Sequence, residues 1–388
     1  MSNEQEIFSF NDKVSREKQQ QMVARILARH LLIVGQTGSG KTTTTLSLLN
    51  YLQHRNQTTI VLDPTGEYAQ LPNAITYKLG VNAYLEAGSL SANELQEVLQ
   101  LTSSQDFQDK LNQAITALRI QHNLVEKDKA YIKCGQKIQN YQHYLEQLGN
   151  WAVDYDLSQL VNQLIEEFII PFADDRADYH LLGQQYDRLA INHNWGMLTT
   201  LRERIDSEMF KTVFDTVSHP GSFKTELSFI LKMFLTQRST HRTLVIDLSL
   251  LKRYEDSQRA LISFLMKKIL NMRFQAPQQL PVNIVIDEAH RYLPQDQKKL
   301  PDNGIFQALR EGRKLHLKVT LTTQSPLDLP AKLRSQFSNG IIHCLIDDNE
   351  IKSLEMNDLG VKGLNVGEAY LKVSDQTAPV TVTKPNWW

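Results

Sequence analysis

Short apolar runs rich in β-branched residues alternate with amphipathic segments in two separate parts of the chain. Strand-like runs lie at 31–35, 58–63, 243–249, 283–288, 318–324, 340–346 and 369–373, and helical patterns lie at 41–54, 254–274 and 303–315. Buried strands that alternate with helices are typical of a largely parallel sheet covered on both faces. The pattern therefore predicts an α/β fold with a mostly parallel sheet.

Between these two parts, over about 80–240, the pattern changes. The segment is rich in Gln and Leu and has helical spacings such as Leu95, Val98 and Leu99. We expect an all-helical insertion, broken near Pro171 and at 219–221. The expected domains are a core of 1–79 and 241–380, an insertion of 80–240 and a tail of 381–388. The two tryptophans that end the tail could dock on a neighbouring surface or pack locally.

Composition excludes several classes of protein. The chain has 41% hydrophobic and 22% charged residues, as ordinary globular proteins do. Its length of 388 residues is typical of two to three domains. The net charge of −1 means that any nucleic-acid surface must be local. Cys134 and Cys344 lie far apart and lack metal-ligand spacing, which argues against disulfides and a zinc site. The polar N-terminus and the lack of a long apolar run predict a cytoplasmic protein without a membrane segment.

The first apolar run leads directly into a phosphate-binding loop. Gly35-x-x-x-x-Gly40-Lys41-Thr42 stands between a predicted strand and a predicted helix, the setting that such a loop requires. The expected nucleotide-binding residues are Gly35, Gln36, Thr37, Gly38, Ser39, Gly40, Lys41, Thr42 and Thr43. Lys41 would neutralise the terminal phosphates, and the Thr42 hydroxyl would bind Mg²⁺. The alternative is a chance Gly-rich turn, which the flanking elements disfavour.

A second motif ends the strand-like run at 283–288. Asp287 at the strand end could hold the hydration shell of Mg²⁺ opposite Thr42, and Glu288 could orient and deprotonate the attacking water. The alternative is a strand that happens to end in two acids. Residues 287–290 also spell the Asp-Glu-Ala-His motif of a helicase group. That group's late Gln-x-x-Gly-Arg-x-Gly-Arg segment is missing, so we interpret the spelling as coincidence.

Asp63 and Glu67 close the second predicted strand, at the sheet edge that should also hold the phosphate-binding loop. They could place water or metal, or contact a neighbouring subunit. The equally weighted alternative is an Asp-Pro turn with Gly66 in a left-handed conformation.

Three further polar residues are candidates for catalysis. Arg310 and Arg313 end a predicted helix and could reach the γ-phosphate bound to a neighbouring subunit, although basic residues are also ordinary at helix C-termini. Gln324 ends a buried strand, where it could sense the phosphate or simply cap the strand.

Taken together, the motifs resemble those of the HerA family in the HerA/FtsK superfamily. The resemblance rests on six segments in order, which are GQTGSGKT, DPTGEY, VIDLS, VIDEAHRYLP, REGRK and TTQSPLDL, and it covers about 30–75 and 240–380. It implies a RecA-like core, with Lys41 and Thr42 on nucleotide and Mg²⁺ and with Asp287 and Glu288 as the Walker B pair. It also implies Gln324 as sensor and Arg310 or Arg313 as the inter-subunit arginine.

The resemblance implies a Mg²⁺-dependent ATPase that forms a homo-oligomer, the family form being a hexamer, and that translocates on double-stranded DNA. By analogy, it would work with a separately encoded effector such as a nuclease, in DNA processing or phage defence. The alternative is an assembly ATPase that licenses a partner enzyme without moving DNA. A conjugative coupling ATPase is disfavoured because no membrane segment is predicted. Members commonly carry an N-terminal β-barrel, whereas here the phosphate-binding loop begins at residue 35, and we expect one helix at most before it.

Overall fold

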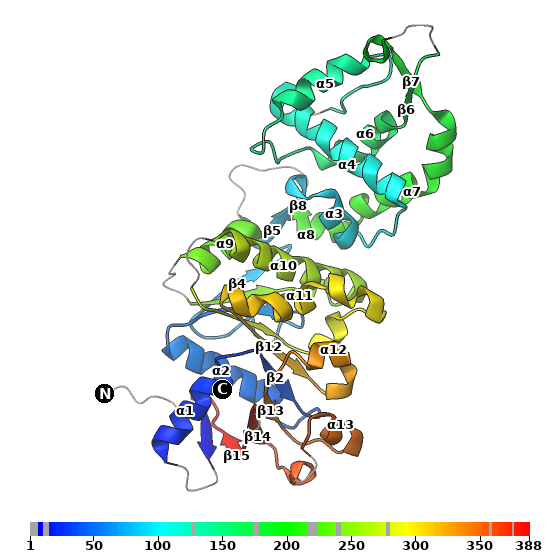
Figure 1. Ribbon diagram of the computed structural model, residues 1–388. Coiled ribbons are helices and arrows are strands. Elements are labelled where there is room, and N and C mark those ends of the chain that lie inside the picture. The colour runs from blue at the N-terminus through cyan, green and yellow to red at the C-terminus, as the bar shows by residue number, and fades with distance from the viewer. Residues whose placement is uncertain are drawn as a thin grey trace. The chain divides into compact units, whose positions relative to one another are not determined.

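A computed structural model describes residues 7–10, 15–125, 127, 129–173, 178–215, 224–237, 242–276, 280–356, 359–374 and 376–388 (Figure 1). The chain divides into two compact units, one of Met1–Lys78 with Ser228–Trp388 and one of Leu79–Leu227. The predicted break at 219–221 lies outside the described residues. In the described ranges, no helix is both long and apolar enough to cross a membrane.

A ten-stranded sheet forms the centre of the first unit, in the order β1-β15-β14-β13-β2-β12-β11-β3-β10-β4. Its strands are β1 (Phe8–Phe10), β2 (Leu31–Val34), β3 (Thr58–Asp63), β4 (Ala74–Lys78), β10 (Thr243–Asp247), β11 (Val282–Ile286), β12 (Leu317–Thr323), β13 (Asn339–Ile342), β14 (Glu368–Val373) and β15 (Gln376–Val382). The seven strands from β13 to β4 pair in parallel, whereas β14, β15 and β1 are antiparallel. The predicted α/β fold with a mostly parallel sheet is confirmed.

The parallel strands are apolar on both faces because helices cover both. All residues of β2 and β11 are buried. Val61, Val245 and Val285 pack on one face with Leu46 and Leu49 of the helix that follows the phosphate-binding loop. Residues of opposite parity in these strands face the other side of the sheet. Figure 1 shows α1 and α2 on one side of the sheet and α10 and α11 on the other.

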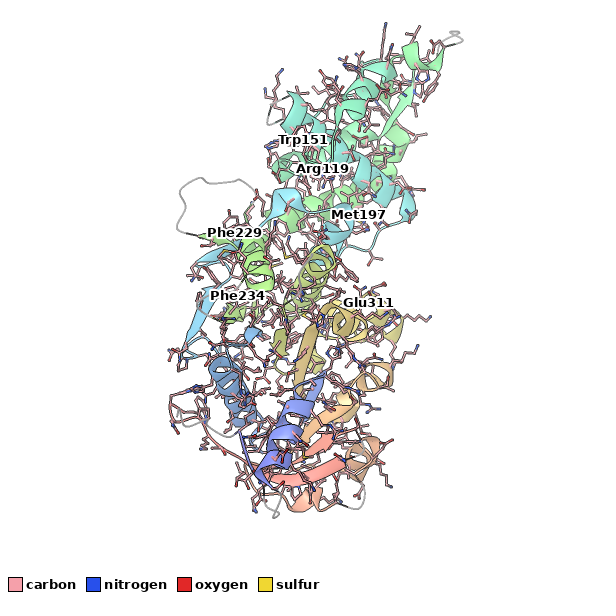
Figure 2. The ribbon with its side chains drawn as sticks, turned by 60° about the vertical axis from the view of Figure 1, so that its left-hand side comes forward. Arg119, Trp151, Met197, Phe229, Phe234 and Glu311 are labelled. Carbon is pink, nitrogen blue, oxygen red and sulfur yellow. The ribbon has the colours of Figure 1, made fainter. Side chains whose placement is uncertain are left out.

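The helices of this unit are α1 (Arg16–Ile26), α2 (Lys41–His54), α9 (Leu227–Thr236), α10 (Glu255–Gln275), α11 (Gly304–Glu311), α12 (Ala331–Arg334) and α13 (Asp348–Ser353). Helix α9 begins at the boundary between the units and buries Phe234 while Phe229 is exposed (Figure 2). Helices α10 and α11 approach closely at Gly304, where a Cβ atom would lie 2.0 Å from the Ser263 carbonyl oxygen.

Three strands of the sheet were not expected from the sequence. Strands β1, β4 and β15 lie at or near the sheet edges, where β4 is only half-buried and β15 is partly exposed, so their apolar signal is weak. Because β1 precedes α1, the expectation of one helix at most before residue 35 is wrong. Because β15 ends at Val382, the predicted tail of 381–388 includes two strand residues.

The C-terminal segment packs locally on α2. The Ser47 hydroxyl donates to the Thr383 carbonyl at 2.6 Å, and Trp387 Nε1 donates to Asn50 Oδ1 at 3.1 Å. These are the contacts expected of the locally packed alternative.

The second unit is mostly helical. Its helices are α3 (Ala92–Val98), α4 (Gln105–Ile120), a π-helical turn (Gln121–Val125), α5 (Ile138–Gln147), α6 (Leu160–Glu167), α7 (Arg188–Asp206) and α8 (Glu208–Val213). It also holds two small sheets, of β8 (Phe214–Asp215), β5 (Ala83–Glu86) and β9 (Thr225–Glu226), and of β6 (Ile169–Pro171) and β7 (Gln184–Tyr186). The expectation that the insertion is all-helical is therefore wrong. Strands of two to four residues are too short to show a periodic pattern.

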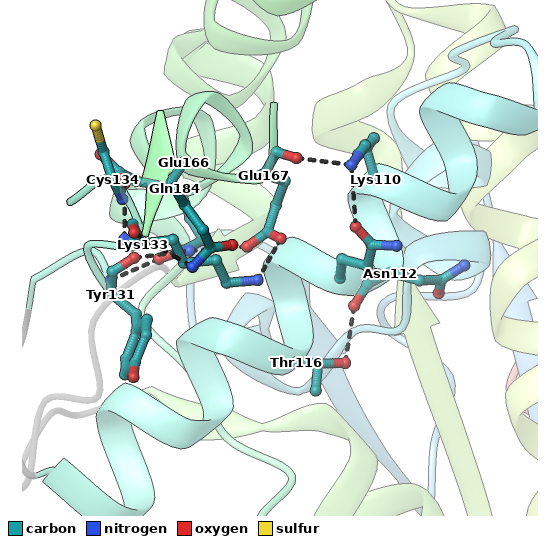
Figure 3. Close-up of polar contacts among 11 residues, drawn as sticks. Lys110, Asn112, Thr116, Tyr131, Lys133, Cys134, Glu166, Glu167 and Gln184 are labelled. Atoms are coloured by element: carbon teal, nitrogen blue, oxygen red, sulfur yellow. Dashed lines mark hydrogen bonds and ion pairs between the residues drawn. The ribbon is translucent and has the colours of Figure 1, made fainter. Parts of the chain in front are cut away.

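Buried polar side chains hold the irregular segment before α5 against α6 (Figure 3). Lys133 forms a buried ion pair with Glu167, and Glu166 accepts the backbone N–H groups of Lys133 and Cys134. Lys110 of α4 donates to the Glu167 carbonyl at 2.7 Å. These bonds replace the backbone pairing that a regular element would provide.

Candidate functional site

The phosphate-binding loop lies at the carboxyl end of β2, between β13 and β12. Its first residues are tied to β12 and to the segment after β13, since the Gly35 N–H donates to the Thr323 carbonyl at 3.4 Å and the Gln36 N–H donates to the Cys344 carbonyl at 3.1 Å. Helix α2 begins at Lys41. The loop is thus anchored to the sheet before it turns into the helix.

The loop requires glycine at named positions. Gly38 and Gly40 have φ angles of +80° and +112°, which side-chain-bearing residues seldom adopt. A Cβ atom on Gly35 would lie 2.5 Å from the Cβ atom of His343. The first N–H groups of α2 have no intrahelical acceptor and can bind phosphate oxygens. Thr42 and Thr43, in that first turn, are partly exposed.

Lys41 is buried, and its ammonium group lies against the loop itself. Nζ donates to the Gly35 carbonyl at 2.7 Å and to the Gln36 carbonyl at 3.2 Å. Burial lowers the pKa of Lys41, against the opposing effect of the Glu288 and Asp287 carboxylates. A bound triphosphate would replace the two carbonyl acceptors with charged oxygens.

Asp287, directly after β11, is held by three hydrogen-bond donors. The Tyr68 hydroxyl donates to Oδ2 at 2.9 Å, and the Thr322 hydroxyl and the Glu288 N–H donate to Oδ1. Burial and the Asp287 charge raise the pKa of Tyr68 well above its ordinary value, so Tyr68 stays a donor. These bonds fix the orientation of the carboxylate in the way that outer partners orient metal-binding groups.

Glu288 has a left-handed backbone, with φ 47° and ψ 46°. This conformation costs free energy for a residue with a side chain. It persists where the surrounding structure imposes it, and such residues cluster at active sites. Here the Glu288 N–H donates to the Thr322 hydroxyl at 2.9 Å. On the side chain, Oε1 accepts from Gln324 Nε2 at 3.3 Å, and Oε2 lies 3.4 Å from His290 Nδ1.

Gln324 joins the two motifs. It follows β12, the strand that lies between β2 and β11. Its Oε1 accepts from the Thr37 hydroxyl at 3.2 Å while its Nε2 donates to Glu288. The side-chain amide therefore connects the phosphate-binding loop to Glu288.

Asp63 makes the contacts expected of an Asp-Pro turn, one of the two alternatives that the sequence left open. Its carboxylate accepts the N–H groups of Gly66 and Tyr68, both at 2.8 Å, and the hydroxyl of Thr65, while Gly66 has a φ of +85°. Burial raises the pKa of Asp63 against the effect of these bonds. Glu67 belongs to the same turn, and partial burial of its carboxylate and the charges of Asp287, Asp63 and Glu288 raise its pKa. Glu67 thus lies near enough to Asp287 and Glu288 for their charges to affect it.

Arg310 and Arg313 are not brought to the site of their own chain. Glu311, between them in sequence, ends α11 (Figure 2), and the segment after it leads into the amino end of β12. Gln324 follows the opposite end of that seven-residue strand, about 20 Å away. Arg313 lies near His30, whose pKa falls to about 4 through burial and, less, through the Arg313 charge. Within this chain, both arginines therefore lie away from the phosphate-binding loop.

Four residues at the site were not singled out from the sequence. Tyr68 and Thr322 orient Asp287, His290 lies beside Glu288, and His343 lies behind the phosphate-binding loop. The contacts that place Tyr68, Thr322 and His343 join residues that are 219, 35 and 299 positions apart in the chain. The contact of His290 with Glu288 is local. Tyr68, His290 and Thr322 stand inside the segments DPTGEY, VIDEAHRYLP and TTQSPLDL, and this was their only signal.

The residues fit a nucleotide-bound Mg²⁺ ion. No group of three or more His, Cys, Asp or Glu side chains in the described ranges could hold a metal alone. Mg²⁺ in phosphate-transfer sites uses one or two carboxylates together with substrate phosphates and water. Thr42 and the fixed Asp287 supply such a partial set, and the ion would neutralise charge on the phosphates. Glu288, held by Gln324, has an oxygen that can accept a proton from water.

A family model, described as the central domain of the helicase HerA, matches residues 22–269. Two relatives described as the DNA double-strand break repair helicase HerA, from Sulfurisphaera tokodaii and Saccharolobus solfataricus, are each 24% identical. The alignments cover 89% of this chain and 62% and 61% of those proteins. The chain thus spans about six tenths of the length of these curated relatives.

Solved structures share the fold. The plasmid coupling protein TrwB bound to an ATP analogue has a TM-score of 0.59 at 15% identity, over 97% of this chain and 95% of that one. VirB4 of Thermoanaerobacter pseudethanolicus has a TM-score of 0.58 at 12% identity, over 92% and 90%. The expected family and RecA-like core are confirmed. By its matched family model, which covers more than half of its length, the chain belongs to the HerA helicase family.

Proposed function

We propose that the protein is a Mg²⁺-dependent ATPase that translocates on double-stranded DNA as a homo-oligomeric ring, with six subunits as the expected number. We further propose that it acts in the cytoplasm with a separately encoded effector, such as a nuclease, in DNA processing or phage defence. Family membership supports the motor, since the relatives are described as DNA repair helicases. The ring and the effector rest on the resemblance alone.

One observation carries the ATPase proposal, namely the chain of contacts from Thr37 through Gln324 to Glu288. Lys41 and the α2 N-terminus would bind the β- and γ-phosphates, and Thr42 with Asp287 would hold Mg²⁺ and its water. Glu288 would orient and deprotonate the attacking water. Gln324 would sense the γ-phosphate and adjust the position of Glu288. Phosphoryl transfer needs little beyond such positioning and charge neutralisation.

Two substitutions test this assignment. Lys41→Ala should abolish ATP binding, because the backbone cradle alone cannot balance the triphosphate charge. Glu288→Gln should bind ATP and lower the hydrolysis rate at least about a hundredfold, since the base is lost while the metal site remains. Glu355→Gln is the matched control, because Glu355 is an exposed glutamate that also has a left-handed φ, of +58°. A Glu288→Gln protein that hydrolyses ATP at the control rate would refute the proposed base.

A second candidate function is an assembly ATPase that scaffolds and licenses a partner enzyme. The net charge of −1 favours it, because DNA-binding surfaces are basic. DNA-stimulated hydrolysis separates the two candidates, because only the motor couples DNA to the ATPase cycle.

A further inference from the structure

His343, just beyond β13, is a completely buried histidine that lies behind the phosphate-binding loop. Its Nδ1 atom lies 2.9 Å from the Glu368 carbonyl oxygen, and its Nε2 atom lies 2.8 Å from the Thr44 hydroxyl. A carbonyl can only accept, so Nδ1 carries the proton and Nε2 is an acceptor. The single proton of the Thr44 hydroxyl is shared between Nε2 and the Gly40 carbonyl, which lies farther away at 3.1 Å. The imidazole thereby joins α2 to β14.

The imidazole remains neutral over the physiological pH range. Burial, and to a smaller degree the Lys41 charge, lower the pKa of His343 to about 4. A neutral ring keeps the Nε2 lone pair available for the Thr44 hydroxyl. The same ring borders the loop, since a Cβ atom on Gly40 would lie 3.7 Å from His343 Cε1.

The His343–Thr44 hydrogen bond is the first tie between the loop region and the C-terminal strands, and Gly367 makes a second. Its N–H donates to the Ser39 carbonyl at 3.1 Å, and its carbonyl accepts the Val382 N–H of β15 at 2.8 Å. Its φ is +87°, a conformation that favours glycine. A Cβ atom on Gly40 would lie 3.1 Å from the Gly367 nitrogen, so a side chain on Gly40 would press on the Gly367 backbone.

The two ties bracket the residues that would bind phosphate. Ser39 precedes Lys41 by two residues, and Thr44 follows it by three. The Thr44 N–H also donates to the Gly40 carbonyl at 2.9 Å, which closes the first turn of α2. Both ties reach the loop from the C-terminal strands, so neither of them uses a phosphate-binding group.

We propose that His343 and Gly367 are positioning residues of the nucleotide site, which hold residues 39–44 from behind in the phosphate-binding conformation. The proposal rests on the proposed nucleotide site. When only a fraction of the molecules has the loop in the ATP-binding conformation, the apparent affinity for ATP falls in proportion to that fraction. The two ties would raise this fraction. They would thereby give a role to the Gly-Glu-Ala-Tyr stretch at 367–370.

Substitutions at His343 and Thr44 test the first tie by titration of ATP binding in the presence of Mg²⁺. His343→Ala should weaken the ATP Kd about three- to tenfold, the loss expected for a hydrogen bond. His343→Gln should restore affinity, because its side-chain oxygen reaches the acceptor position of Nε2, whereas the shorter His343→Asn should not. Thr44→Val should match His343→Ala, Thr44→Ser should bind normally, and the double variant should be no weaker than either single one.

His30→Ala is the control for loss of a buried imidazole. His30 is buried, has a pKa lowered to about 4 and accepts the Val319 N–H at 3.0 Å, but it precedes the opposite end of β2. We expect it to lower the unfolding midpoint as His343→Ala does and to leave the ATP Kd unchanged. Should His343→Ala not fold, the Gln and Asn variants and Thr44→Val make the same comparison.

Gly367→Ala tests the second tie, with Gly135→Ala as its control. Both glycines have positive φ, of +87° and +77°, and neither has an atom within 4 Å of an added Cβ. The N–H of Gly135 also donates to a backbone carbonyl, that of Gln184. Both substitutions should therefore add similar strain, but only Gly367→Ala should weaken the ATP Kd.

Lys41→Ala distinguishes the possible failures. If it loses ATP binding while the His343 and Gly367 variants bind ATP as well as their controls do, the positioning roles are wrong and the site stands. If Lys41→Ala itself binds ATP normally, the proposed nucleotide site is wrong.

Discussion

At the scale of single residues, two buried histidines link protonation to folding. The pKa values of His30 and His343 are lowered from 6.5 to about 4 in the folded chain, mainly by burial. Between these values the unfolded chain binds a proton that the folded chain does not. The stability that each neutral ring contributes is therefore complete above pH 6.5 and is lost as the pH falls towards 4.

We predict that the free energy of unfolding falls with pH in this window by up to about 1.4 kcal/mol per pH unit for each histidine. Urea unfolding of the wild type, His30→Gln and His343→Gln between pH 4.5 and 7.5 measures it. Each variant should have a shallower slope than the wild type over this range. Equal slopes in all three proteins would contradict the neutral, buried rings.

Roles that a contiguous motif defines were predictable, and roles that depend on distant contacts were not. Gly35 to Thr42, Asp287, Glu288 and Gln324 stand at strand ends that the hydrophobic pattern located, and the structure brings them to one sheet edge. Tyr68 and His343 reach Asp287 and Thr44 through pairings of 219 and 299 residues. A single sequence holds no periodic signal for such pairings.

At the scale of elements, strand burial explains what the sequence could predict. The buried parallel strands β2, β3 and β12 lie within a residue of their expected ranges, because apolar residues occupy both faces. Edge strands such as β1 and β4 keep one side or one end exposed, so they escape the pattern. The short strands of the second unit are fixed by tertiary contacts.

The packing of α11 on α10 depends on Gly304, and we predict that Gly304→Ala destabilises the protein. The added Cβ would lie 2.0 Å from the Ser263 carbonyl oxygen and 3.0 Å from the Lys267 nitrogen, so the helices must separate, at a cost of about 1–3 kcal/mol. Gly196→Ala in α7 is the control, since an added Cβ there meets nothing within 4 Å and should stabilise by about 0.5–1 kcal/mol. Urea unfolding followed by circular dichroism compares them, and a neutral Gly304→Ala would refute the close approach.

At the scale of the whole molecule, the position of Arg310 and Arg313 makes a prediction about assembly. They lie at the amino end of β12, away from the nucleotide site of their own chain. In a ring, they would complete the site of a neighbour. Added Arg310→Ala or Arg313→Ala subunits should therefore inhibit wild-type ATP hydrolysis by more than their mole fraction. An inhibition strictly proportional to mole fraction would assign these arginines a local structural role.

DNA contacts in the proposed motor would come from short loops, since the net charge of −1 provides no broad basic face. The segment from Arg310 to Lys318 is one candidate, although its arginines are also proposed for catalysis. Contacts to the DNA backbone depend on salt and carry no sequence code. Binding should therefore be modest, salt-sensitive and indifferent to base sequence.

The ATP hydrolysis rate as a function of duplex DNA concentration, at low salt with Mg²⁺, tests the central claim most directly. We predict that duplexes of several tens of base pairs stimulate hydrolysis whatever their sequence, that added salt reverses the stimulation, and that Glu288→Gln stays inactive with or without DNA. If duplex DNA neither binds nor changes the rate, the motor is contradicted and the assembly ATPase takes its place.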